Sequence, residues 1–341
     1  MAINGAENQQ FLENLGYRVL SHFLAGHGYP PVAIGEANEC RFCGETSNRN
    51  IRNVAHSVPE GLGNHWITSN DECDRCNAFF SQYDDSLCKS VGAILSLGGT
   101  IGKGGRIRQT GRSKGASVIS FDKEAGHSKI FYQASVPPVG KPSEIPLEIS
   151  FFTGGEMKTV IPTPKESFVP RHAYKALAKI GLATLPAEKL THFSKLRSWI
   201  MSDDESEDFS FLDVCISTGS LGKAPPLVAV TILERLPYLC DRPSHLLVVI
   251  VGSVCWQVDL MPDELDDSIG LLQFGKINIP WSVIAKDYET EPAPVSYGFP
   301  IHFDWSSNSS IEVPIAAVNN YFNEETNKGR VEVTWRQMVP V

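Results

Sequence analysis

The sequence predicts an α+β protein in which a small zinc-stapled module lies between an N-terminal helix and a larger, β-rich domain. Two Cys-x-x-Cys pairs stand near the start of the chain, and apolar residues recur at helical spacing after the second pair. Most of the remainder consists of β-branched and aromatic runs separated by turn residues. We expect the N-terminal helix in residues 1–35, the zinc-stapled module in residues 36–115, and a β-rich α+β domain containing a helical pair in residues 116–341.

Length and composition are those of an ordinary globular protein. The chain has 341 residues, enough to bury a large core, and contains no run of about 18 apolar residues that would indicate a membrane span. Its first residues, MAINGAENQQ, lack the basic and apolar regions of a secretory signal. We therefore expect a cytoplasmic protein without membrane contact, where thiols stay reduced and paired cysteines more often bind metal than form disulfides.

The N-terminal segment carries an apolar stripe at helical spacing over residues 7–26 (Phe11, Leu12, Leu15, Val19, Leu20, Phe23 and Leu24). His27, Gly28 and the two prolines that follow are expected to end this helix. It can pack on the zinc-stapled module or on a second copy of the chain, so a homo-oligomer is one of the candidate assemblies.

The two cysteine pairs predict a metal site. Four thiolates at this spacing can surround one zinc ion as a tetrahedron, and the four residues are Cys40, Cys43, Cys73 and Cys76. The isolated cysteines have no close partner in the sequence, and we expect them to be small buried apolar residues: Cys88, Cys215, Cys240 and Cys255.

Between and after the cysteine pairs, the pattern predicts a strand, a loop, a second strand and a helix. The first strand covers residues 51–57 and carries His56 near its end, and the second lies around residues 66–68. The helix begins near Cys76 and has one buried stripe (Phe79, Phe80, Tyr83, Leu87, Val91, Ile94 and Leu95).

The motifs CRFC, HSVPEGLG and CDRCNAFF together resemble the HNH endonucleases of the ββα-metal fold, in the group with a zinc staple. The resemblance covers about sixty residues. It implies a phosphodiesterase that cuts DNA with Mg²⁺ or Mn²⁺, beside a structural Zn²⁺. Modules of this kind often act as effectors of prokaryotic defence systems, which is the context that the resemblance suggests.

The resemblance assigns roles to three residues. His56 matches the general base, Asn77 matches a ligand of the catalytic ion, and Asn64 matches a polar position that fixes the loop or orients the histidine. Each has a structural alternative: a hydrogen-bonded loop histidine for His56, a residue that satisfies free N–H groups at the helix start for Asn77, and turn chemistry for Asn64.

One position departs from the commonest family pattern. Many HNH enzymes carry a metal-binding carboxylate directly before the histidine, where this chain has Ala55. Asp84 is on the same helical face as Asn77 but about 10.5 Å along the axis, too far to share an ion easily with it, and is a candidate to orient that region. Glu60 and His65 are the other candidates. The alternative function is a catalytically degenerate, zinc-stapled protein that binds nucleic acid or acts as an adaptor.

The net charge of −9 argues against uniform coating of nucleic acid, but basic residues concentrate locally. Residues 86–120 contain Lys89 and no acidic residue, and a glycine-rich stretch within them is expected to hold the DNA backbone through Lys103, Arg106, Arg108, Arg112 and Lys114. A solvated loop is the alternative. The stretch is not a P-loop, because no Gly-Lys-Ser/Thr opens a helix there.

Residues 116–341 show no catalytic signature and are expected to recognise a protein partner, a small-molecule activator or the substrate. Strands are expected at SVISF, KIFYQASV, LEISFF and KTVIP, and again from FLDVCIS onward, on either side of two helices and an acidic linker at residues 201–209. On the first helix Arg171, Lys175 and Lys179 recur on one face, which predicts a solvated face or, as the alternative, a second phosphate contact.

Overall fold

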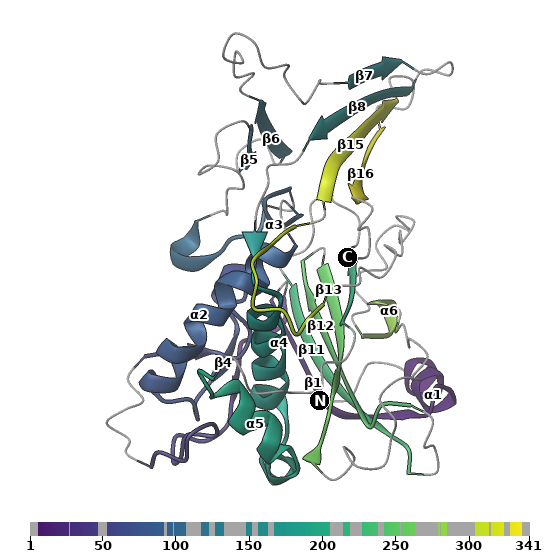
Figure 1. Ribbon diagram of the computed structural model, residues 1–341. Helices are drawn as coiled ribbons and strands as arrows, with labels where there is room; N and C mark the ends of the chain where they lie inside the picture. The colour runs from purple at the N-terminus through teal and green to yellow at the C-terminus, as the bar shows by residue number, and fades with distance from the viewer. Residues whose placement is uncertain are drawn as a thin grey trace.

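The computed structural model has a mixed α+β fold, which confirms the predicted class (Figure 1). Its main parts are a five-stranded sheet and the zinc-stapled module, which lies on one side of the sheet with a helix between them. The residues that the structure describes are 6–26, 28–46, 53–91, 94–97, 99–106, 117–122, 127–132, 148–151, 156–162, 167–204, 214–218, 227–237, 242–252, 254–263, 279, 281–284, 304–313, 315–323 and 328–335.

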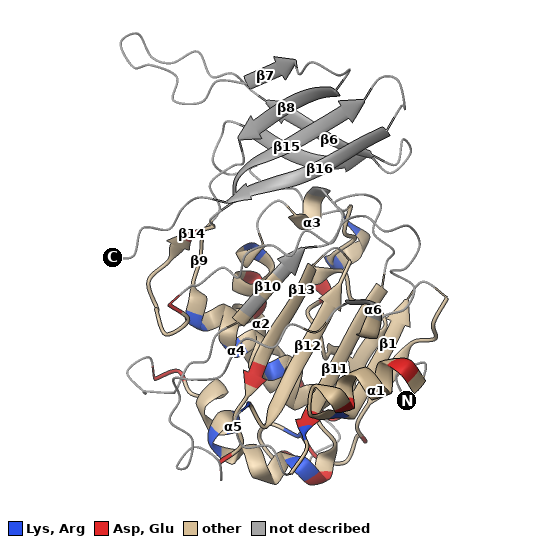
Figure 2. Ribbon diagram, turned by 90° about the vertical axis from the view of Figure 1, so that its right-hand side faces the viewer, with Lys and Arg blue, Asp and Glu red and all other residues tan. Residues whose placement is uncertain are grey.

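The five-stranded sheet is antiparallel and almost entirely apolar. Its strands are, in spatial order, β1 (Tyr17–Gly26), β11 (Leu227–Arg235), β12 (His245–Val251), β13 (Val254–Leu260) and β10 (Val214–Thr218). Every residue of β12 is buried, because apolar side chains cover both faces of the sheet. Figure 2 shows the short helices α1 (Ala6–Asn14) and α6 (Trp281–Ile284) on the face away from the module.

The prediction of one helix over residues 7–26 is wrong. The helix stops at Asn14, Gly16 follows with a φ of 81°, and the chain then enters β1, which pairs with β11. Positive φ is accessible to glycine at little cost, so Gly16 allows the helix to end there. The spacing of the apolar residues in β1 is compatible with a helix when the segment is considered alone. Here the neighbouring strand β11 supplies hydrogen-bond partners for the backbone and apolar contacts, so the segment forms a strand.

The zinc-stapled module has the predicted order of elements. These are β3 (Ala55–His56), the short helix η2 (Glu60–Leu62), β4 (Ile67–Ser69) and α2 (Asp74–Ser90). Strand β2 (Val32–Ile34), which the sequence did not reveal, adds a parallel neighbour to β4. Strands of two or three residues contribute few ladder bonds, so their placement depends on the loops and on α2.

The predicted helical pair is present as α4 (Pro170–Thr184), followed by η4 (Ala187–Phe193) and α5 (Ser194–Ile200). Helix α4 lies between α2 and the five-stranded sheet (Figure 1), and nearly all its residues are buried. The prediction of a solvated face is therefore wrong: Arg171, Lys175 and Lys179 are only 6%, 4% and 3% exposed. Packing of α2 over this face removes it from solvent.

Most other predicted strands are also present. β5 (Ser117–Asp122) pairs with β6 (His127–Tyr132), and a four-stranded sheet has the order β16 (Lys328–Trp335), β15 (Ile315–Asn323), β8 (Glu156–Pro162) and β7 (Glu148–Phe151). A short pair joins β9 (Ser167–Phe168) to β14 (Ile311–Glu312), and α3 (Ile94–Leu97) and η3 (Lys103–Gly105) follow α2. β15 was not predicted, and most of the expected strand at residues 271–279 lies outside the described residues.

Two further predictions bear on the interior and on membranes. Cys88 and Cys255 are buried, as expected, whereas the side chains of Cys215 and Cys240 lie outside the described part. Among the described residues, no helix has both the length and the apolar character needed to cross a membrane. The domain boundaries at residues 35 and 115 stay predictions.

Candidate functional site

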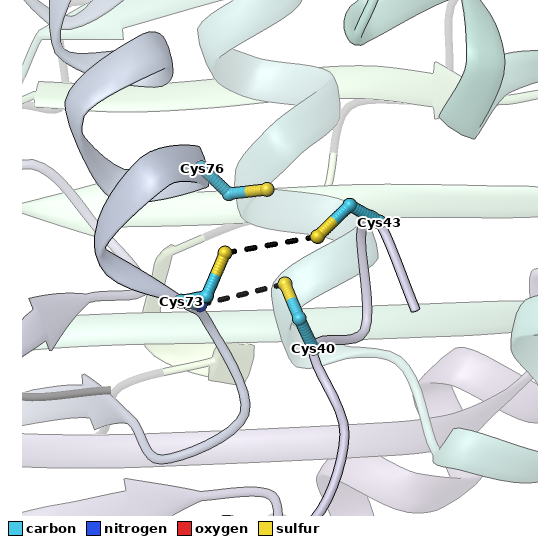
Figure 3. Close-up of side chains that lie close together, drawn as sticks. All are labelled: Cys40, Cys43, Cys73 and Cys76. Atoms are coloured by element: carbon cyan, nitrogen blue, oxygen red, sulfur yellow. Dashed lines mark hydrogen bonds between the residues drawn. The ribbon is translucent and has the colours of Figure 1, made fainter. Parts of the chain in front are cut away.

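Four cysteine thiols converge where the loop after β2 meets the start of α2 (Figure 3). The sulfur atoms of Cys40, Cys43, Cys73 and Cys76 all lie within 4.8 Å of one another. The Sγ atoms of Cys43 and Cys73 are 3.7 Å apart, which is close to the edge of about 3.8 Å expected for thiolates around zinc at about 2.3 Å. The predicted cluster can therefore hold a structural zinc ion.

The thiols differ in acidity, and burial raises the pKa of Cys73. A hydrogen bond from the Cys76 thiol lowers the pKa of Cys40 to about 4 and raises the pKa of Cys76. The backbone N–H of Cys73 donates to Cys40 Sγ at 3.4 Å. The thiolate is the form that binds zinc, and at neutral pH Cys40 is in this form.

Arg41 joins this cysteine loop to Asp71 through a buried ion pair and to the end of α4 through hydrogen bonds. The Arg41 guanidinium lies 2.8 Å from Asp71 Oδ2, and its Nη1 donates to the carbonyl oxygens of Leu182 and Leu185 at 2.7 and 3.0 Å. These carbonyls lie at the C-terminal end of α4, where the helix dipole favours a cation. Sequence reasoning missed both Arg41 and Asp71, although Arg41 lies inside the first Cys-x-x-Cys.

His56 lies at the end of β3, opposite Thr68 of β4. Its Nδ1 is buried and has no hydrogen-bond partner among the described residues. Burial lowers the pKa of His56; the neighbouring Glu60 raises it, and His65 and Lys179 lower it further. At neutral pH the uncharged ring is therefore the favoured form.

Lys179 of α4 lies between Glu72 and His56. Its Nζ is 2.9 Å from Glu72 Oε2 and donates to the backbone carbonyl of His56 at 2.7 Å. Burial raises the pKa of Glu72, and the Lys179 ammonium opposes that rise. Sequence reasoning missed Glu72; its only signal is a carboxylate directly before the second Cys-x-x-Cys.

Asn77 and Asp84 lie two turns apart on α2, the separation that the sequence predicted. Burial raises the pKa of Asp84, whereas Lys179 and Lys103 lower it. Helix α2 begins at Asp74, and the Asn77 N–H donates to the Cys73 carbonyl at 2.9 Å. The Asn77 side chain is half-buried, and both of its predicted roles stay predictions.

Asn64 is fully buried and fixes the loop between β3 and β4. Its Nδ2 donates to the carbonyls of Val58 and Ile67 at 2.7 and 2.8 Å, and its Oδ1 accepts from the N–H groups of Trp66 and Ile67 at 3.1 and 2.9 Å. These bonds use the whole amide. They fit the predicted loop-fixing role and leave no atom of the amide for a substrate.

Glu60 and His65, the other candidates to replace the missing carboxylate, lie close to each other. His65 Nδ1 is 3.5 Å from Glu60 Oε1, and its Nε2 lies 2.8 Å from the carbonyl of Ile101. The Gly104 N–H donates to Glu60 Oε1 at 3.4 Å. Together these contacts tie the histidine loop to the first part of the glycine-rich stretch.

The start of the predicted basic surface borders this site. Lys103 and Arg106 are exposed, and the charge of Lys103 acts on Asp84. The other three predicted phosphate-binding residues lie outside the described residues: Arg108, Arg112 and Lys114. Comparison with known proteins finds no matching family model, no matching curated protein and no matching solved structure.

Proposed function

We propose that this protein is a metal-dependent HNH endonuclease that hydrolyses phosphodiester bonds in DNA. One observation carries the proposal: a histidine with an unpartnered, buried ring nitrogen lies on a short strand of the strand–loop–strand–helix unit, whose helix begins at the four-cysteine cluster. The motif resemblance predicts the same histidine as the base. A role as an effector of prokaryotic defence is the context that we propose for it.

In this proposal the imidazole of His56 accepts a proton from the attacking water. The lowered pKa favours the neutral imidazole that a general base requires. Bound Mg²⁺ or Mn²⁺ would stabilise the negative charge that develops on the phosphate and the leaving oxygen. The amide oxygen of Asn77 is of the oxygen-ligand type that such hard cations prefer. Asp84, two turns further along α2, would support this region without sharing the ion. Lys103 and Arg106 would contact the DNA backbone.

The decisive experiment is plasmid cleavage with Mg²⁺ or Mn²⁺ by zinc-loaded protein, comparing the wild type with His56→Ala. Loss of a general base lowers the rate by about 10²- to 10⁴-fold. His192→Ala is the matched control, because His192 is exposed and lies on η4. Retained cutting by His192→Ala with loss in His56→Ala supports the proposal. Equal cutting by the wild type and His56→Ala would remove His56 from the mechanism.

A second candidate function is a zinc-stapled protein that binds nucleic acid, or serves as an adaptor, without cutting it. Two observations favour it. Ala55 is fully buried where many family members carry a carboxylate. Within the described ranges, the four cysteines are the only group of three or more His, Cys, Asp or Glu residues whose ligand atoms lie close enough to share an ion.

This second candidate predicts DNA binding without cleavage under any divalent ion. Titration of a labelled duplex with the protein between about 50 and 200 mM salt, read by fluorescence anisotropy, would show that the logarithm of the affinity falls linearly with the logarithm of the salt concentration if the protein contacts phosphates.

A third hypothesis is that residues 116–341 form a sensor that switches on the nuclease. Cleavage that appears only after a cell extract or a small molecule is added would support it.

A further inference from the structure

Lys179 has an unusual environment for a lysine. It is 3% exposed, lies in the middle of α4, and its ammonium is 5.8 Å from the centre of the Phe80 ring. A buried ammonium is costly unless it is paired and hydrogen-bonded. Here the partners are the Glu72 carboxylate at 2.9 Å and the His56 backbone carbonyl at 2.7 Å.

These two partners belong to different parts of the zinc-stapled module. Glu72 directly precedes the second cysteine pair, whereas His56 ends β3. Strand β3 has only two residues, and its ladder with β4 is correspondingly short. A third element, α4, therefore supplies a bond to the residue whose ring has to be held in place.

We propose that Lys179 is a positioning residue for His56: by bonding the His56 carbonyl and the Glu72 carboxylate at once, it fixes the histidine-bearing strand against α2 and α4. Its consequence for cleavage rests on the proposed nuclease function. The positioning itself does not, because the bond and the state of the imidazole can be measured on protein that cuts nothing.

The charge of Lys179 also acts on the His56 ring. Burial is the largest cause that lowers the pKa of His56; Glu60 raises it, and His65 and Lys179 lower it further. The Lys179 ammonium therefore favours the neutral imidazole that base catalysis requires.

The test compares the double variant Lys179→Met/Glu72→Met with the wild type. Replacing both members of a buried pair by apolar residues avoids leaving one charge unpaired, which is the costly outcome. Lys175→Met is the matched control, since Lys175 is equally buried one turn away and its ammonium donates to the Ser202 carbonyl instead. Lys179→Arg preserves the charge. The readouts are the NMR titration of the His56 ring, assigned with His56→Ala, and the pH profile of cleavage.

We expect the His56 titration midpoint to rise in the double variant and to stay near the wild-type value in Lys175→Met and Lys179→Arg. The acidic limb of the cleavage profile should move to higher pH with it. The rate should fall by up to about 10²-fold, the cost of small misplacement of a catalytic group. A folded double variant with wild-type titration and wild-type cleavage would overturn the proposal.

If the double variant does not fold, the wild-type protein provides the answer. A buried ammonium bonded to a carbonyl should give a slowly exchanging ¹H–¹⁵N signal that is absent from Lys179→Arg. Its presence with a coupling to the His56 carbonyl carbon supports the proposal, and its absence overturns it. A wild-type protein that shows this signal but cuts no DNA would refute the nuclease function alone.

Discussion

The zinc-stapled module and the five-stranded sheet are stabilised by different means. The sheet has strands of five to ten residues with apolar side chains on both faces. The module has strands of only two or three residues, four converging thiols and two buried ion pairs, Arg41–Asp71 and Lys179–Glu72. Both regions nevertheless share one apolar cluster that runs from α2 through α4 to the sheet.

This contrast explains why the two buried ion pairs involve the zinc-stapled module and not the sheet. Burial of apolar surface contributes about 25 cal/mol per Å², which is enough to stabilise a long strand. A two-residue strand buries too little apolar surface to fix its own position. The module compensates with directional bonds, which set angles and distances that apolar contact leaves free. A site that holds one histidine requires such geometry.

Removal of zinc is expected to have the largest effect, and to separate the two regions. Structural zinc sites contribute apparent binding free energies on the order of 10 kcal/mol. Cys76→Ser, or chelation, should abolish hydrogen-exchange protection in β2, β3, β4 and the first turns of α2. Strands β11 and β12 should keep theirs. Equal loss of protection in the sheet, measured by mass spectrometry, would show that the regions unfold as one unit.

Breaking the Arg41–Asp71 pair should rank second. Arg41→Met leaves Asp71 buried without its guanidinium and removes the donor to the end of α4, at a cost of about 3–5 kcal/mol. Urea unfolding monitored by circular dichroism gives the value. Arg41→Met/Asp71→Leu, which leaves no unpaired charge, should recover part of the loss. A single variant as stable as the wild type would contradict the assigned importance of this pair.

Acid should destabilise the sheet more gently, through His22 and His245. Burial lowers the pKa of each to about 4, from an ordinary value of 6.5. Between pH 6.5 and 4 the unfolded chain therefore binds protons that the native chain does not, so stability is full above 6.5 and falls as the pH falls toward 4. His22→Gln should flatten this dependence in urea titrations at pH 7, 5.5 and 4.5. An unchanged slope would show that His22 does not contribute.

Local sequence signals predicted the elements that depend on neighbouring residues. The cysteine spacing, the stripe from Phe79 to Leu87 in α2 and the helical pair after residue 169 are all determined within one or two turns of chain. The predicted continuation of the stripe to Ile94 and Leu95 lies on the separate helix α3. The order of β3, loop, β4 and α2 followed from the same signals. The sequence also placed Asn64 in the loop between the two strands. It could not distinguish loop fixing from orientation of the histidine or turn chemistry, because that requires knowing which groups the amide atoms bind.

What the sequence did not reveal depends on distant residues. Residues 17–26 form a strand because β11 lies beside them. In the same way, residues 32–34 form β2 because β4 lies beside them. Lys175 and Lys179 have the spacing of a solvated face, and only the packing of α2 over α4 buries them. Ion pairs such as Lys179–Glu72 join residues more than a hundred positions apart, and no local pattern encodes such a pairing.

The pairing of β1 with β11 has a consequence for how the polypeptide is made. Roughly 200 residues, including the whole metal module and the helical pair, are synthesised between these two adjacent strands, and such distant pairings form slowly. On the ribosome β1 remains without its neighbour until residue 235 has emerged. A fragment that stops before that point would expose an unsatisfied apolar edge, so shortened versions should aggregate even when their metal module is intact.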